Sequence, residues 1–252
     1  MLRDHPALGD GRAQSVFRGG TCLAKVHLGF YRLSEDLDFL VSTPVEATRS
    51  HRSRRAAESK AAVATIEKQL PGLRTVTPLT RANDSRQYTA VVAYRSLLVQ
   101  REETVNIEVG FREPLLTPAV GGEAKTLLLD PISTSPLVPA LTLRSLAREE
   151  AMAEKLRAAL TRREVAIRDF YDVEYAVRRL GFRVQDPSLV ELVRQKLAVP
   201  GNEPVDVSAN RLAALKAQLE SELKPVLRDE DFAEFDLDRA FATVAEVAVA
   251  LG

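Results

Sequence analysis

Residues 17–41 read FRGGTCLAKVHLGFYRLSEDLDFLV, in which a Gly-Gly-Thr turn precedes two aspartates set in an apolar run. If residues 37–41 form a strand, alternate side chains point to opposite faces, so Asp36 and Asp38 share one face and the apolar residues take the other. Two neighbouring carboxylates repel each other and are rarely buried without a partner. A bound cation, above all Mg²⁺, is the expected compensation, and it indicates phosphate chemistry.

Length and composition limit the class of protein. The 252 residues, 45% of them hydrophobic, are enough for a real core in one large domain or two modest ones. Cys22 is the single cysteine, which excludes an intramolecular disulfide, and no Cys/His spacing suits zinc. The first residues lack a signal-peptide pattern, and no apolar run reaches the ~18 residues of a membrane span. We therefore expect a cytoplasmic protein without a membrane partner.

The charge is balanced overall but unevenly placed. Lys plus Arg and Asp plus Glu each number 35, so no global basic field points to nucleic acid. Residues 49–55, RSHRSRR, nevertheless form a dense basic cluster. Two interpretations stay open for it, a solvated loop and helix start, and a phosphate-binding patch. Any RNA contact is therefore expected to be local.

Hydrophobic periodicity predicts a mixed first half. The predicted elements are a turn and helix over 13–30, a strand over 37–41, a helix over 56–70, and two antiparallel strands over 88–99 and 104–111. In the first of these, Gly19 and Gly20 break the chain and Thr21 is placed to cap the helix.

The second half is predicted to be helical. Residues 115–139 are rich in proline and contain a Gly-Gly pair, which indicates an irregular linker. The predicted helices that follow cover 146–160, 165–180, 188–197, 207–223 and 232–251. We therefore predict an α/β (α+β) protein with a core domain over 1–130 and a helical domain over 131–252.

The aspartate pair needs neighbours to handle a nucleotide. Gly19 and Gly20 allow close approach of the backbone to phosphates, and the Thr21 hydroxyl adds a donor. A third carboxylate on a neighbouring strand would complete a two-metal site, and Glu108 is the candidate because it faces the polar side of its predicted strand. The alternative for Glu108 is an ordinary exposed strand residue.

Two runs together resemble a known family. GGTCLAKVHLGFYRLSEDLDF resembles the first motif of the AbiEii/AbiGii-type nucleotidyltransferase toxins, which include mycobacterial toxins and belong to the DNA polymerase β-like nucleotidyltransferase superfamily. EEAMAEKLRAALTRREVAIRDFYDVEYAV resembles the later motif, a helix with a lysine followed by an Arg-Asp-x-x-Asp helix. The resemblance spans residues 17–177 and implies a polymerase β-like core with a mixed sheet, followed by a helical domain.

The resemblance implies a role for each matching residue. Asp36 and Asp38 match the metal-binding carboxylates, and Gly19, Gly20 and Thr21 match the phosphate-cradling turn. Arg32 and Ser34 match the RxSxD signature and are expected to bind the nucleotide, as is the motif lysine, Lys155. Asp169 or Asp172 matches the late acidic residue.

General chemistry fits the later motif but leaves alternatives. The ammonium of Lys155 can neutralise charge that develops on a transferring phosphoryl group. Without the resemblance, Lys155 would be taken for a surface residue, because glutamates flank it. Asp169 and Asp172 lie three positions apart on one helix face. Asp172 can instead pair with Arg168, which favours Asp169 as the catalytic residue.

The resulting hypothesis is a toxin of a toxin–antitoxin system. It would transfer a nucleotide from an NTP, with Mg²⁺, to an acceptor that the resemblance implies is the 3′ end of tRNA, and a cognate antitoxin protein would be its partner. One alternative is a protein-modifying nucleotidyltransferase or a kinase that uses the same site. Another is a non-catalytic member that binds the antitoxin.

Overall fold

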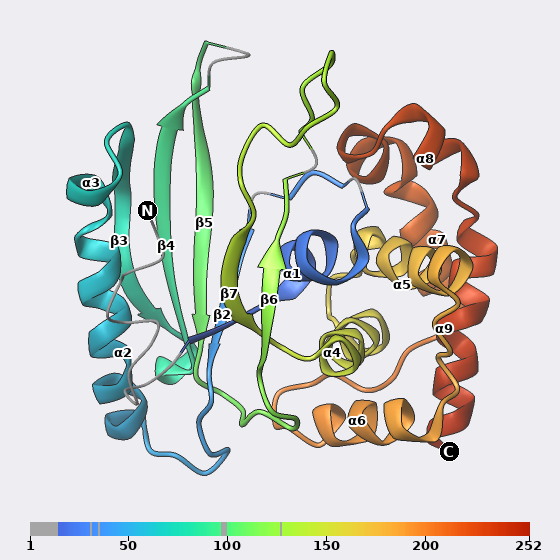
Figure 1. The fold of residues 1–252 in the computed structure, drawn as a ribbon. Coiled ribbons are helices and arrows are strands. Elements are labelled where there is room, and N and C mark those ends of the chain that lie inside the picture. The colour runs from blue at the N-terminus through green and yellow to red at the C-terminus, as the bar shows by residue number, and fades with distance from the viewer. Residues whose placement is uncertain (1–14, 31, 35, 97–99, 127) are drawn as a thin grey trace. The chain divides into compact units, whose positions relative to one another are not determined.

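The structure, a computed structural model, describes residues 15–30, 32–34, 36–96, 100–126 and 128–252. These residues form a seven-stranded sheet with the strand order β3-β4-β5-β2-β1-β7-β6 (Figure 1). The strands are β1 (Ser15–Arg18), β2 (Asp36–Val41), β3 (Leu73–Ala82), β4 (Gln87–Arg95), β5 (Glu102–Gly110), β6 (Val120–Ala124) and β7 (Leu141–Ser145). β2 pairs with β5 and β1 with β7 in parallel, and the other pairs are antiparallel. The sheet is therefore mixed and the class is α/β, as predicted.

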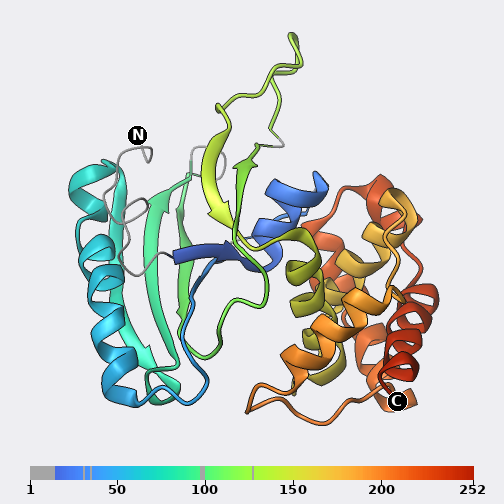
Figure 2. The same cartoon turned by 60° about the horizontal axis from the view of Figure 1, so that its bottom comes forward.

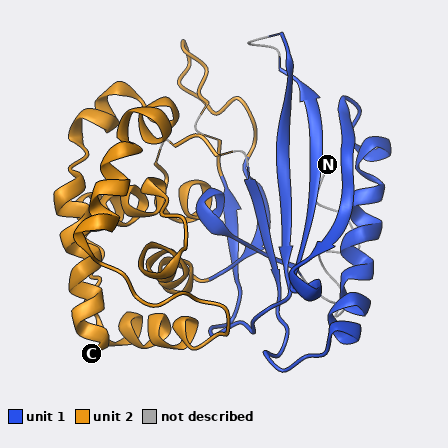
Figure 3. Cartoon of the chain, turned by 180° about the vertical axis from the view of Figure 1, so that it is seen from behind, with its two compact units in different colours: residues 1–22, 35–124, 140–146 blue, residues 23–34, 125–139, 147–252 orange. Residues whose placement is uncertain are grey.

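The chain forms two compact units, which Figure 3 shows in different colours. Unit 1 comprises residues 1–22, 35–124 and 140–146, and it holds the whole sheet. Unit 2 comprises residues 23–34, 125–139 and 147–252, and it is mainly helical. The run that opens with Gly-Gly-Thr is thus divided, because its central segment belongs to the helical unit. The simple division near residue 130 stays a prediction.

The core of unit 1 lies between α2 (Arg49–Ala64) and the sheet. Figures 1 and 2 show α2 running beside β3, and apolar residues of α2 pack on inward-facing residues of the strands. The buried members of this core are Val41, Ala56, Val63, Leu79, Tyr88, Ala90, Val92, Ile107, Val109 and Phe111. Alternation along β5 places Ile107 and Val109 in the core and leaves Asn106 and Glu108 on the other face. The predicted antiparallel pair, β4 and β5, is confirmed.

The Gly-Gly-Thr segment folds differently from the prediction. The strand β1 directly precedes it, and Gly19 opens helix α1 (Gly19–Cys22), which continues as a π-helical segment, Leu23–Leu28. Thr21 lies inside the helix, so its predicted capping role is wrong. The four residues of β1 were too short a run to show a strand period in the sequence.

Three further strands, β3, β6 and β7, lie where the sequence predicted none. β3 contains Pro78 and register irregularities between Thr75 and Thr80, which obscure its alternation. β6 lies in the segment predicted to be an irregular linker, and it pairs with β7. Its Gly-Gly pair indicated an irregular linker, but pairing across the sheet overrides that local preference.

The basic cluster at residues 49–55 forms the first two turns of α2, which starts seven residues earlier than predicted. Thr48 caps the helix, because its Oγ1 accepts a hydrogen bond from the His51 amide at 3.2 Å. Arg52 is buried and donates to the backbone carbonyls of Ala47 and Asp84. The helix-start interpretation is therefore confirmed, and one arginine of the cluster supports the fold.

The described helices of unit 2 follow the predicted pattern closely. They are α4 (Arg148–Thr161), α5 (Ile167–Leu180), α6 (Pro187–Leu197), α7 (Ala209–Ala217), α8 (Asp229–Glu234) and α9 (Leu237–Leu251). α5 ends at Gly181, whose φ of 63° is the left-handed conformation that favours glycine. The last predicted helix is divided into α8 and α9 by an extended Phe235 and the capping residue Asp236. Shorter helical pieces are α3 (Ile66–Gln69), Asn83–Ser85, Leu219–Leu223 and Lys224–Val226.

Within the parts of the chain that the structure describes, we find no helix both long and apolar enough to span a bilayer.

Candidate active site

Strand β2 presents the aspartate pair on one face of the sheet in unit 1. Asp36 lies opposite Asn106 and Asp38 lies opposite Glu108 in the β2–β5 register. Asn106 Nδ2 donates to Asp36 Oδ1 at 3.1 Å, so one carboxylate is oriented by the neighbouring strand. Both aspartates are half-buried. The predicted strand and the shared face are confirmed.

Gly19 brings the backbone of α1 against Asp38. A Cβ atom at Gly19 would lie 2.1 Å from Asp38 Oδ2, and the φ of Gly19 is +76°. Both the space and the conformation exclude other residues without rearrangement. The glycine therefore allows close approach of the Asp38 carboxylate to the backbone. The predicted approach of this backbone to the phosphates of a nucleotide stays a prediction.

The side chain of Thr21 makes a hydrogen bond within the protein. It is buried, and its hydroxyl donates to the Asp36 carbonyl oxygen at 2.7 Å. This bond ties α1 to the first residue of β2, so Thr21 supports the position of the aspartates. A role of the hydroxyl as a phosphate donor stays a prediction.

Glu108 is near the pair in register, but its carboxylate contacts other residues. Gln87 Nε2 donates to its Oε2 at 2.6 Å, and Arg18 NH2 lies 3.4 Å from its Oε1. Among the described residues, no three His, Cys, Asp or Glu side chains are gathered closely enough to hold a metal ion. The three-carboxylate group of Asp36, Asp38 and Glu108 is therefore not formed here.

The two aspartates alone still fit Mg²⁺. The ion prefers oxygen ligands, and it usually takes one or two protein carboxylates and completes its shell with water and substrate phosphates. Asp36 and Asp38 supply two carboxylates on one strand face, and the backbone of Gly19, which lacks a Cβ, lies next to Asp38. Mg²⁺ held by these two residues and a nucleotide is consistent with this donor set.

Unit 2 contains a second charged cluster, which is buried. Lys155 Nζ lies 2.8 Å from Asp169 Oδ1 and 2.9 Å from Asp172 Oδ2. Arg32 Nε and NH2 donate to the two oxygens of Asp172 at 2.8 and 3.1 Å. The structure thus brings together the motif lysine, both candidate acids and Arg32. The alternative of a surface Lys155 is wrong, because only 9% of this residue is exposed.

Asp172 has partners other than the predicted one. It is fully buried, and its contacts are with Arg32 and Lys155 rather than with Arg168. The Arg32 guanidinium holds it with two parallel hydrogen bonds, the geometry that gives arginine–carboxylate pairs their specificity. Because the guanidinium of Arg32 is occupied by Asp172, we interpret Arg32 as a residue that supports the fold rather than one that touches the nucleotide. Ser34 is half-buried, and its role stays a prediction.

The charges of the cluster stabilise one another. Burial alone would lower the pKa of Lys155, but the carboxylates of Asp169 and Asp172 raise it. Burial alone would raise the pKa of Asp169, but Lys155 and then Arg162 lower it. Lys155 is therefore an ammonium and Asp169 a carboxylate near neutral pH. The ammonium of Lys155 thus lies within ion-pair distance of two carboxylates.

Acid should weaken this cluster. A lowered folded-state pKa for Asp169 stabilises the protein above the unfolded value of about 3.9, and the stabilisation is lost as the pH falls through the folded value. We expect the D169N variant to lose more unfolding free energy at pH 7 than at pH 2.5, measured by urea denaturation. D238N, whose side chain is 72% exposed, is the control. An equal loss at the two pH values would contradict the prediction.

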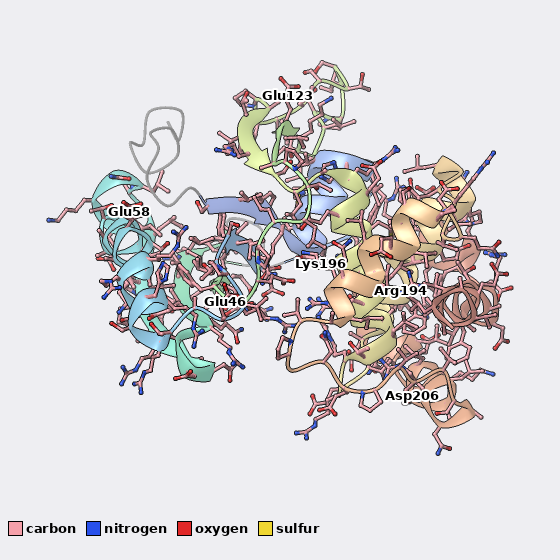
Figure 4. The ribbon with its side chains drawn as sticks, turned by 90° about the horizontal axis from the view of Figure 1, so that it is seen from below. Glu46, Glu58, Glu123, Arg194, Lys196 and Asp206 are labelled. Atoms are coloured by element: carbon pink, nitrogen blue, oxygen red, sulfur yellow. The ribbon has the colours of Figure 1, made fainter. Side chains whose placement is uncertain are left out.

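Lys196 supports the helix that carries Lys155. It is labelled in Figure 4, comes from α6 and is fully buried. Its Nζ lies 2.8 Å from Glu150 Oε1 and 3.2 Å from Glu154 Oε1, both on α4. Two of the glutamates that flank Lys155, Glu150 and Glu154, are therefore buried partners of another lysine. Sequence spacing gave no sign of this contact, since α6 lies some 40 residues further along the chain.

Arg18 and Glu113 are further polar residues that the sequence did not indicate. Only 11% of the Arg18 side chain is exposed, and its NH1 lies 3.3 Å from Oε1 of the buried Glu113. The sequence feature that could have indicated Arg18 is its position directly before Gly19 and Gly20. Glu113 lies beyond the end of β5 and carried no signal.

A shallow hollow in unit 2 gathers further basic residues. It has a volume of about 490 Å³, and Arg162, Arg163, Glu164, Val165, Ala166, Gln218 and Glu222 line it. Arg162 NH1 also lies 3.5 Å from Asp169 Oδ2, so the hollow adjoins the buried cluster. Two arginines and two glutamates balance in charge, and the hollow carries no strong basic field.

Comparison with known proteins finds a family match over nearly the whole chain. Residues 4–247 match the sequence model of a family described as "Nucleotidyl transferase AbiEii toxin, Type IV TA system". Similar solved structures include JHP933 from Helicobacter pylori, with 15% identity, a TM-score of 0.46, and coverage of 96% of this chain and 84% of that one. Another is a putative nucleotidyltransferase from H. pylori, with 15% identity, a TM-score of 0.48, and coverage of 96% and 87%. A search of curated proteins finds no match.

Proposed function

Because the chain belongs to the AbiEii nucleotidyl transferase toxin family of type IV toxin–antitoxin systems, we propose that it transfers a nucleotide from an NTP to the 3′ end of tRNA. The family implies both a nucleotide substrate and an antitoxin partner. The observation that carries the proposal is the Asp36–Asp38 pair on one strand face, with Gly19 against Asp38. A tRNA acceptor implies that the protein acts in the cytoplasm.

The reaction is an in-line displacement at the α-phosphorus. The 3′ hydroxyl oxygen gives its proton to water and forms the new bond to phosphorus, the bond to the oxygen that bridges the α- and β-phosphates breaks, and pyrophosphate leaves. Asp36 and Asp38 would hold Mg²⁺, which, when bound, neutralises charge on the phosphates and favours loss of the hydroxyl proton. Asn106 and Thr21 keep Asp36 oriented for this task.

The later motif supplies the second set of predicted catalytic residues. Lys155 carries a fixed positive charge suited to the charge that builds on a transferring phosphoryl group. Asp169 is preferred over Asp172 as the late acidic residue, because both oxygens of Asp172 accept hydrogen bonds from Arg32 and one of them also faces Lys155. Asp172 would then position Lys155.

Incubation with labelled nucleotides tests the proposal. Purified protein, Mg²⁺ and total RNA are incubated with each of the four NTPs labelled at the α-phosphate, and in parallel with γ-labelled NTPs. We expect α-label in a tRNA-sized band. α-Label in protein would replace the RNA acceptor with a protein one, and γ-label in any product would indicate a kinase. Absence of label from every product would contradict the enzymatic proposal and leave antitoxin binding.

Substitution of Gly19 should disable the site. Alanine at this position places a Cβ 2.1 Å from Asp38 Oδ2, and it must adopt a φ of +76°. A displacement of reacting groups by about 1 Å can cost roughly 10²-fold in rate, so we expect a loss of at least that size in the labelling assay. G121A is the matched control, since its Cβ would meet no atom within 4 Å. Equal activity of the two variants would show that the close approach is unimportant.

A further inference from the structure

Glu108 lies where a third metal ligand was expected, but its contacts with Gln87 and Arg18 indicate a different role. One oxygen accepts from Gln87 at 2.6 Å and the other faces Arg18 at 3.4 Å. Register places Glu108 directly across from Asp38, but the described carboxylates form no group of three that could hold an ion. A carboxylate that binds a metal ion and a carboxylate that holds an arginine have different roles, and the contacts of Glu108 favour the second role.

Arg18 is fixed from two sides. Its NH2 faces Glu108 and its NH1 lies 3.3 Å from Oε1 of Glu113, a residue that is fully buried. Gly110 leaves room for the guanidinium, because a Cβ there would lie 2.7 Å from Arg18 NH2. A planar guanidinium can bridge two carboxylates in this way, whereas a lysine ammonium cannot reproduce the fork. The site is thus shaped around an arginine.

The position of Arg18 connects it to the aspartate pair. It is the last residue of β1, it lies opposite Asp38 in the β1–β2 register, and Gly19 follows it. Residues directly opposite in antiparallel strands have Cβ atoms about 5 Å apart. Anchoring the Arg18 side chain to β5 therefore fixes the backbone just before Gly19, and with it the contact between Gly19 and Asp38.

We propose that Arg18 is a positioning residue for Asp38 and that Glu108 is its anchor rather than a metal ligand. The proposal rests on the proposed function in one respect, the binding of a divalent ion by Asp36 and Asp38. Removal of an outer partner of a metal ligand typically lowers metal affinity by about 10–100-fold. Arg18 should behave as such a partner, and Glu108 should act only through Arg18.

The test measures Mn²⁺ as a probe for Mg²⁺, by electron paramagnetic resonance of free Mn²⁺ during titration of the purified full chain. The variants are E108Q, E108L, R18M and the double variant R18M/E108L, with D38N as the reference that loses a ligand. E108Q keeps an oxygen acceptor for Arg18 and should bind Mn²⁺ within about threefold of the wild type. R18M should bind about 10–100-fold more weakly, and E108L should add nothing to it.

Each contrary result has a distinct meaning. An affinity of E108Q as low as that of D38N, or a further drop of tenfold or more from R18M to the double variant, would make Glu108 a ligand and overturn the proposal. Wild-type affinity in R18M would overturn it as well. Circular dichroism and thermal melting check that each variant is folded, and E108Q keeps the test open if E108L does not fold. Because Mn²⁺ binding needs no acceptor, a failure to label RNA would count against the proposed function and not against this inference.

Discussion

Replacement of Asp38 by asparagine is expected to abolish nucleotide transfer, with a loss of at least about 10²–10³-fold in kcat. A metal ion supplies several kcal/mol of stabilisation to a phosphoryl transition state, and each 1.36 kcal/mol is a factor of ten in rate. Asparagine keeps the size of aspartate but removes the charge that holds the ion. Because Asp38 is half-buried on the face opposite the core, the fold should survive.

The measurement is the rate of α-label incorporation into RNA at saturating NTP and Mg²⁺. E102Q is the matched control, because Glu102 lies on the adjacent strand β5 and its exposed side chain pairs with Arg74. Its activity should equal that of the wild type. If D38N retained activity within about threefold of E102Q, the aspartate pair would not be the metal site, and the proposed function would fail at its main observation.

Replacement of Asp172 by alanine is expected to cause the largest loss of stability. Asp172 is fully buried and faces both Arg32 and Lys155, so its removal leaves buried positive charge without its partner. Breaking a buried ion pair in this way typically costs about 3–5 kcal/mol. For a chain of this size, that corresponds to a fall in Tm of roughly 6–20 °C.

Urea denaturation followed by circular dichroism measures this loss, and D238A provides the exposed control. A second variant separates charge from packing. Replacing Arg32 by methionine together with Asp172 by leucine removes the pair as a whole, and apolar replacements of a buried pair are often neutral. We expect this double variant to be more stable than D172A. A loss below about 1 kcal/mol in D172A would show that the cluster is not structurally important.

Periodicity and the resemblance together predicted much of the chain. Alternation in β2 and β5 placed Asp36, Asp38 and Glu108 on one face, and helical spacing predicted α4 and α5 within a few residues. In these elements the local pattern and the tertiary packing agree. The predicted helix began only at residue 56, because the basic run at residues 49–55 looks like a solvated loop, yet arginine is a good helix former and α2 begins at Arg49.

The missed features depend on contacts between distant residues. The pairing of Arg32 with Asp172 joins two motifs that the sequence suggested only separately, and no local spacing indicates it. The same holds for Lys196 with Glu150 and for Arg18 with Glu113. Buried polar groups need partners, but the sequence does not say which ones. A charged residue within a motif can thus either contact the substrate or stabilise the fold.

During synthesis, Arg32 in the first motif can pair with Asp172 only after the ribosome has made residue 172. The partners are 140 residues apart, and a ribosome adding about 5–20 residues per second needs roughly 7–28 s to make that stretch. We expect ribosome-bound chains arrested before residue 172 to be cleaved by protease within residues 23–34, and full-length chains to resist. Equal resistance would contradict this. A chain released early would therefore carry the aspartates without the helices that its first motif needs, so truncated products should be harmless to the cell that makes them.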